Sequence, residues 1–120
     1  EKLVGTIRAK RPRTKVLLLA IFPRGPRRDP DGCVTPAEEV DAARRMRVIA
    51  ETNSYLARLD DGCQVRFLDI GNVFLGQDGR IPFSLMPDQL HLSPSGYQLW
   101  AEAMEPCLSE MLGEAGENIR

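Results

Sequence analysis

The hydrophobic pattern of the chain contains two short segments that are predicted to be strands. Residues 15–22 begin with a lysine and are then apolar up to Pro23, and residues 65–70 form a second short segment that ends at Gly71. A continuous apolar run as long as that of the first segment is typical of a strand buried on both faces, as in parallel sheets. Both segments are therefore predicted to be strands of one parallel sheet.

Three other segments carry apolar residues at helical spacing. The first covers residues 2–9. The second opens at Thr35, a capping residue, followed by Pro36 at the first helical position and by Glu38, which would complete a capping box. The third opens at Ser93. The positions predicted to face a core are Val40, Ala43, Met46, Ile49 or Ala50, and Leu56 in the second helix and Tyr97, Trp100, Ala101, Met104 and Leu108 in the third.

The order helix, strand, helix, strand, loop, helix predicts a parallel α/β sheet with helices on both faces, a three-layer α/β/α fold. Residues 1–112 are assigned to this unit, and residues 113–120 are predicted to be a frayed tail. Two parallel strands are too few to cover three helices. Further strands are expected from an upstream segment of the same gene product, a separate polypeptide or a partner subunit.

Composition narrows the function classes only a little. The chain has 120 residues, 42% of them hydrophobic and 28% charged, which is typical of a single globular domain and not of a disordered chain. A net charge of -1 gives no reason to expect a nucleic-acid partner, and no apolar run is long enough to span a membrane. Residues 1–8 resemble a helix interior and not a signal peptide, so a soluble, cytoplasmic protein is favoured over a secreted one.

The cysteine and histidine counts argue against a metal site. Cys33, Cys63 and Cys107 lie far apart in the sequence, and the chain has one histidine, so no zinc site is predicted. The three thiols are predicted to be free and mostly buried, although one disulfide remains an open alternative.

The chemistry that the sequence suggests is concentrated just before the third helix, where Asp88 and His91 lie three residues apart. A carboxylate so placed can accept a hydrogen bond from one imidazole nitrogen. That bond fixes the tautomer and leaves the other nitrogen free to take a proton from a hydroxyl nucleophile. By spacing alone, a capping or surface histidine is the more frequent interpretation.

Residues 88–97 resemble the last conserved block of the SGNH (GDSL-type) hydrolases, in which Asp-x-x-His followed by Gly-Tyr supplies the acid and base of a catalytic triad. Residues 16–25 are similar to a strand and turn of the same family. In character the chain is similar to the branch that contains the platelet-activating-factor acetylhydrolase catalytic subunits and related bacterial acetyl esterases. The resemblance implies that residues 1–112 are the C-terminal half of such a domain, with two of about five strands of a flavodoxin-like sheet.

The resemblance implies a serine esterase for acetyl or other short-chain esters, with Asp88 and His91 as catalytic residues and no cofactor. The family's Gly-Asp-Ser block and its oxyanion-hole residues are not in this sequence, so the nucleophilic serine is expected in the N-terminal half of the domain. The chain's own serines, at positions 54, 84, 93, 95 and 109, have no nucleophile-like context. A homodimer and a non-catalytic binding or interface module remain open alternatives.

Substrate contacts are predicted from the loop that follows the first strand. Arg24, Arg27 and Arg28 form a basic patch where ligands of open α/β sheets bind, although they also suit a solvated loop. We predict a contact between Arg24 and the substrate. The residues predicted to line an acyl pocket near the catalytic loop are Phe22, Leu85, Met86 and Leu90. For Phe22, packing in the core is an equally good interpretation.

Overall fold

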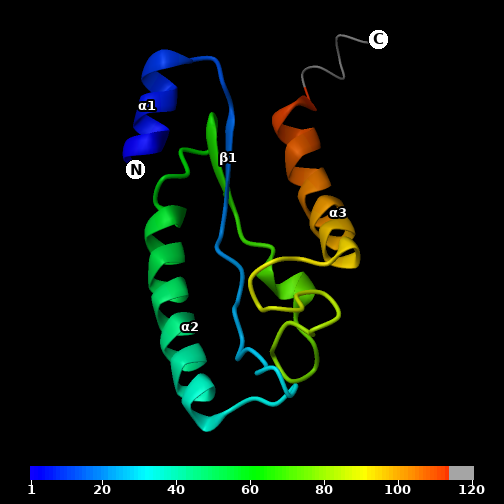
Figure 1. Ribbon diagram of the computed structural model, residues 1–120. Helices are drawn as coiled ribbons and strands as arrows, with labels where there is room; N and C mark the ends of the chain where they lie inside the picture. The colour runs from blue at the N-terminus through cyan, green and yellow to red at the C-terminus, as the bar shows by residue number, and fades with distance from the viewer. Residues whose placement is uncertain (114–120) are drawn as a thin grey trace.

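The computed structural model describes residues 1–113 as alternating helices and strands (Figure 1). In chain order the elements are the helix α1 (Lys2–Lys10), the strand β1 (Val16–Leu19), the helix α2 (Pro36–Ala57), the strand β2 (Val65–Leu68), the short 3-10 helix η1 (Gly71–Phe74) and the helix α3 (Pro94–Met111). The order of the α-helices and strands is the predicted one, and η1 lies in the segment that was predicted to be a loop. The predicted tail, residues 113–120, lies outside the described residues except for Gly113.

The two strands form a parallel sheet, as predicted. Val16 pairs with Val65, and the register continues to the pair of Leu19 with Leu68. In Figure 1 the strands lie between α1 and α2 on one side and α3 on the other, which makes three layers. The α/β/α architecture is therefore confirmed, with two strands and three α-helices in the part of the chain that is described.

The strand β1 is shorter than the apolar run that contains it. At Ile21, beyond the end of β1, the backbone of the run bonds a side chain of α2 instead of the backbone of β2. The N–H of Ala20 still donates to the carbonyl of Leu68 at 2.9 Å. The N–H of Ile21 donates to Oδ1 of Asn53 at 2.8 Å, and the Ile21 carbonyl accepts from Nδ2 at 2.9 Å. The amide of Asn53, on α2, thus pairs both backbone polar groups of Ile21.

The helix α2 begins at the predicted cap. The hydroxyl of Thr35 accepts from the N–H of Glu38 at 3.2 Å, and Pro36 occupies the first position. The Glu38 carboxylate is turned to other partners instead of completing a capping box. It accepts from Nη2 of Arg45 at 2.6 Å and from the N–H of Arg27 at 3.1 Å. These donors favour the ionised carboxylate and lower the pKa of Glu38 to about 2.

The buried face of α2 differs from the predicted one. Val40 is 60% exposed and Ala43 is exposed, whereas Ala42 is buried. The inner face includes two polar residues, Arg45 and Asn53, that bond the backbone of the segment after β1. A hydrophobicity pattern cannot place these residues inside, so the predicted face was wrong at Val40 and Ala43.

The buried face of α3 is also rotated from the prediction. Tyr97 is 51% exposed and Ala101 is exposed, while Gly96, Cys107 and Met111 are buried. The partly buried members of the predicted face are Trp100, Met104 and Leu108. The face turns because the glycine, which has no side chain, lies against the preceding loop at the start of the helix.

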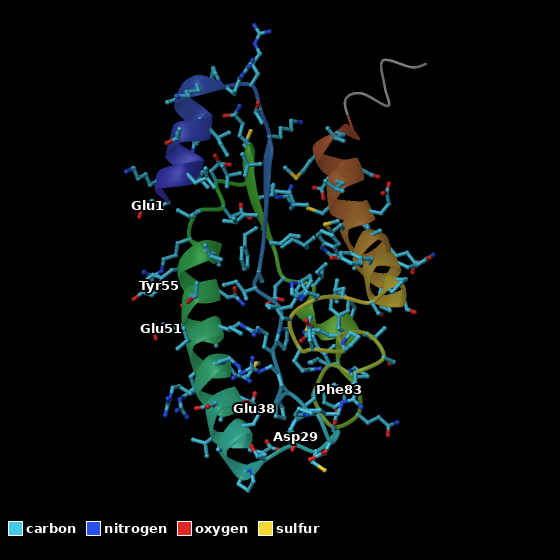
Figure 2. The ribbon with its side chains drawn as sticks, in the orientation of Figure 1. Glu1, Asp29, Glu38, Glu51, Tyr55 and Phe83 are labelled. Carbon is cyan, nitrogen blue, oxygen red and sulfur yellow. The ribbon has the colours of Figure 1, made fainter. Side chains whose placement is uncertain are left out.

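A small core lies at the carboxyl end of the sheet and supports the loops there. Its buried members are Ile70, Phe74, Ile81 and Met86. The ring of Phe22 packs on it, with its centroid 4.8 Å from that of Phe74. Figure 1 shows the loop after β1 and the loop before α3 lying together at this end, and Figure 2 places Asp29, Glu38 and Phe83 there. In open α/β sheets this end is where ligands bind.

The three cysteines lie within the described residues, 1–113. Cys33 and Cys63 are exposed, Cys107 is buried, and all three are free. The prediction of mostly buried thiols was wrong for the first two, which lie outside the helices and strands.

No three His, Cys, Asp or Glu side chains of the described residues gather as a metal site, and no described helix has the length and apolarity of a membrane span.

Candidate active site

Asp88 and His91 lie in the loop that leads into α3, and their side chains are in direct contact. Oδ2 of Asp88 is 2.6 Å from Nδ1 of His91. Oδ1 of the same carboxylate accepts from the N–H of His91 at 2.7 Å and from the N–H of Leu90 at 2.9 Å. One carboxylate therefore holds both the backbone and the ring of the histidine. The contact expected from the spacing is present, and the catalytic role of the pair stays a prediction.

The charge of Asp88 is strongly favoured by these contacts. The His91 side chain, then the His91 N–H and the Leu90 N–H, hold the pKa of Asp88 well below its ordinary value of 3.8. The His91 side chain is 73% exposed. A carboxylate on Nδ1 keeps the proton on that nitrogen and leaves Nε2 free to accept another. This arrangement is the one that a general base and its orienting acid require, and the roles of the two residues stay a prediction.

Gln89, between the two, is the site residue that the sequence did not indicate. Its side chain is buried, and its Oε1 accepts from the N–H of Gly25 at 3.0 Å. Its Nε2 donates to the carbonyls of Ile81 and Met86. Sequence reasoning missed Gln89 because a glutamine in a loop is most often solvated. Its position between Asp88 and His91 was the one available signal of a role in the site.

The other end of the loop is fixed at the start of α3. The hydroxyl of Ser93 accepts from the N–H of Gly96 at 3.2 Å and donates to the carbonyl of Ser84 at 2.7 Å. The N–H of Ser93 donates to the carbonyl of Leu85 at 2.8 Å. Ser93 is therefore the helix cap that the sequence predicted, and it also ties the helix to the preceding loop.

Replacing Gly96 with alanine is expected to destabilise the fold. A Cβ at this position would lie 2.6 Å from the carbonyl oxygen of Leu85 and 3.0 Å from Cδ2 of Leu92. Because the first contact is with backbone, the loop must shift. We expect Gly96→Ala to lower the free energy of unfolding by about 2–3 kcal/mol. Urea denaturation followed by circular dichroism measures this change.

Gly5→Ala is the matched control for that substitution. A Cβ at Gly5, inside α1, would meet no atom within 4 Å. Alanine there is expected to stabilise the helix by about 0.5–1 kcal/mol. Equal urea midpoints for the Gly96→Ala variant and the unsubstituted protein would contradict the close packing of α3 on the loop.

A shallow apolar pocket lies beside His91. Its volume is about 190 Å³. It is lined by Phe22, Leu90, His91, Leu92, Tyr97 and Trp100. Phe22 and Leu90 thus lie beside His91, and their contact with a substrate stays a prediction. The Phe22 ring also packs on the core. The aromatic rings of α3 were not expected to be here. Met86, by contrast, is 1% exposed within the core, so its predicted place in the pocket was wrong.

The three arginines after β1 all have partners within the protein. Nε of Arg24 donates to the carbonyl of Gln89 at 2.9 Å, which places this side chain against the loop that carries Asp88 and His91. Nε of Arg27 forms an ion pair with Glu38 at 3.3 Å. The guanidinium of Arg28 lies 3.9 Å from the centroid of the Phe83 ring. A contact between Arg24 and substrate stays a prediction.

Comparison with known proteins identifies the family. The family model described as GDSL-like Lipase/Acylhydrolase matches residues 1–99. The chain belongs to this GDSL-like family. The family that the sequence suggested from residues 88–97 is therefore confirmed.

Similar proteins show how much of their length the chain spans. The alpha2 subunits of platelet-activating factor acetylhydrolase IB from Rattus norvegicus and Mus musculus are each 28% identical over 118 residues, covering 98% of this chain and 45% of theirs. A solved structure from Streptococcus pneumonia that carries the name of platelet activating factor matches with a TM-score of 0.66 at 23% identity, covering 88% of this chain and 47% of that one. The chain thus spans about half the length of these relatives.

Proposed function

We propose that the protein containing this GDSL-family chain is a serine esterase that hydrolyses acetyl or other short-chain carboxylic esters. The observation that carries the proposal is the contact between Asp88 and Nδ1 of His91, with the exposed histidine beside an apolar pocket. The nucleophilic serine and the oxyanion donors would come from the N-terminal half of the domain, outside residues 1–120. Further strands from that half would extend the two-stranded sheet.

The proposed reaction has two acyl-transfer steps. Nε2 of His91 takes the proton of the serine hydroxyl as its oxygen attacks the ester carbonyl, and the protonated ring then gives that proton to the leaving alcohol. Water next attacks the acyl-enzyme while His91 takes its proton, and the proton returns to the serine as the acid leaves. Asp88 stays ionised throughout and stabilises the imidazolium. No cofactor enters either step.

The apolar lining of the pocket beside His91 supports a carboxylic ester, whose acyl group is itself apolar. The names of the rat and mouse relatives, which are acetylhydrolase subunits, agree with an acetyl ester. Acetyl esters are therefore the first substrates to try.

The direct test is to label the protein, produced from its natural reading frame, with a fluorophosphonate that modifies activated serines. We expect one modified serine outside residues 1–120, found by peptide mass mapping, with parallel loss of hydrolysis of a p-nitrophenyl acetate substrate. Heat-denatured protein is the control and should stay unmodified. Absence of both labelling and hydrolysis would contradict the esterase and favour the non-catalytic module. A label on one of this chain's own serines would overturn the proposed place of the nucleophile.

A further inference from the structure

Gln89 combines burial with a position between two exposed catalytic candidates. Its side chain is 1% exposed, whereas those of Asp88 and His91 are 54% and 73% exposed. Burying an amide costs free energy unless its polar atoms find partners. The buried amide of Gln89 therefore needs hydrogen-bond partners within the protein, whereas its two exposed neighbours can also bond to water.

Both polar groups of the Gln89 amide are hydrogen-bonded. Their partners lie in the segment after β1 and in the segment before α3. Oε1 accepts from the N–H of Gly25 at 3.0 Å. Nε2 donates to the carbonyl of Met86 at 2.9 Å and to that of Ile81 at 3.1 Å. The backbone carbonyl of Gln89 accepts from Nε of Arg24 at 2.9 Å. The segment after β1 and the segment before α3 are thus held together through one residue.

The backbone of Gln89 also has an uncommon conformation. Its φ is 54°, the one positive value among the non-glycine residues that the structure describes. A left-handed residue of this kind is disfavoured unless its surroundings hold it in place. The reversal of the chain at Gln89 lets Oδ1 of Asp88 accept from the backbone N–H groups of Leu90 and His91, while Oδ2 meets the ring.

The approach of Gly25 shows how closely the amide is held. A Cβ on Gly25 would lie 2.8 Å from Oε1 of Gln89, a distance that atoms cannot keep without a shift. The segment after β1 therefore has a residue without a side chain, Gly25, at the point where the buried amide needs room. This contact ties the geometry of the catalytic loop to the carboxyl end of the sheet.

We propose that Gln89 is a positioning residue for the Asp88–His91 pair, acting through its buried hydrogen bonds to Gly25, Ile81 and Met86. The inference deepens the proposed esterase, because it assigns the residue that fixes the orientation of the base. A catalytic group displaced by about 1 Å loses about 100-fold in rate. Gln89 keeps the carboxylate and the imidazole in contact although both are exposed.

The test replaces Gln89 with methionine, which has a similar length and no amide, in the protein produced from its natural reading frame. We expect kcat for p-nitrophenyl acetate to fall about 100-fold with KM changed less than about 3-fold. The pKa of Asp88, followed by ¹³C NMR of its carboxyl carbon, should rise toward its ordinary value. The ¹⁵N spectrum of His91 should change from the Nδ1–H form to a mixture of tautomers.

Two further variants keep the test decisive if Gln89→Met does not fold. Gly25→Ala keeps the whole Gln89 side chain but displaces its Oε1, so it should change kcat and the Asp88 titration in the same direction and by less. Gln98→Met is the matched control, since Gln98 is an exposed glutamine of α3 that bonds Glu102. Its kcat and NMR spectra should equal those of the unsubstituted protein.

The outcomes separate this inference from the proposed function. An unchanged Asp88 titration and an unchanged His91 tautomer in folded Gln89→Met or Gly25→Ala protein would overturn the positioning role, whatever the activity. If the unsubstituted protein neither hydrolyses esters nor reacts with a fluorophosphonate, the esterase proposal fails. The NMR comparison would then still decide whether Gln89 orients the pair.

Discussion

Replacing His91 with alanine is expected to lower kcat for a short-chain ester by about 10⁴- to 10⁶-fold, with little change in KM. The imidazole is the group that would move the proton in every step of the proposed reaction, and the chain contains no second histidine to replace it. Because the side chain is 73% exposed, its removal should leave the free energy of unfolding nearly unchanged. Steady-state kinetics and urea denaturation on the same samples measure both quantities.

Ser95→Ala is the control for this substitution. Ser95 is exposed in the first turn of α3, close to the loop, and its hydroxyl has no part in the proposed reaction. Its kcat should match that of the unsubstituted protein. A His91→Ala variant that keeps full activity would show that the histidine is incidental and that the Asp-x-x-His spacing does not mark the active site of this protein.

Asp88→Asn is expected to lower kcat by about 10⁴-fold through the wrong tautomer of His91. Oδ1 of Asp88 accepts from two backbone N–H groups, so the oxygen of an asparagine amide will take that position. Its NH₂ group must then face Nδ1 of His91, which can only accept from it. The ring proton moves to Nε2, and the nitrogen that should take the serine proton no longer can.

The ¹⁵N spectrum of His91 checks this explanation independently of activity. It should show the Nε2–H form in Asp88→Asn and the Nδ1–H form in the unsubstituted protein. Asp78→Asn is the matched control, because Asp78 also accepts from a backbone N–H, that of Arg80, in an exposed turn. Retention of the Nδ1–H form together with full activity in Asp88→Asn would contradict the role given to the acid.

The sequence determined the local features of this fold well, because caps and strands depend on residues that are close in the chain. Thr35 and Ser93 cap α2 and α3 as predicted. The apolar segments form paired parallel strands, with Val16 opposite Val65. The spacing of Asp88 and His91 likewise predicted their contact, since three residues of a turn bring the two side chains together.

The tertiary structure decided which side chains face inward and what holds the site. Hydrogen bonds from Arg45 and Asn53 to the backbone after β1 fix the rotation of α2 so that Val40 is exposed. Gln89 is buried because backbone groups of segments far away in the sequence, such as the N–H of Gly25, need a partner at that point. Hydrophobicity and spacing describe each segment separately, and they cannot show where one segment leaves a polar group for another to satisfy.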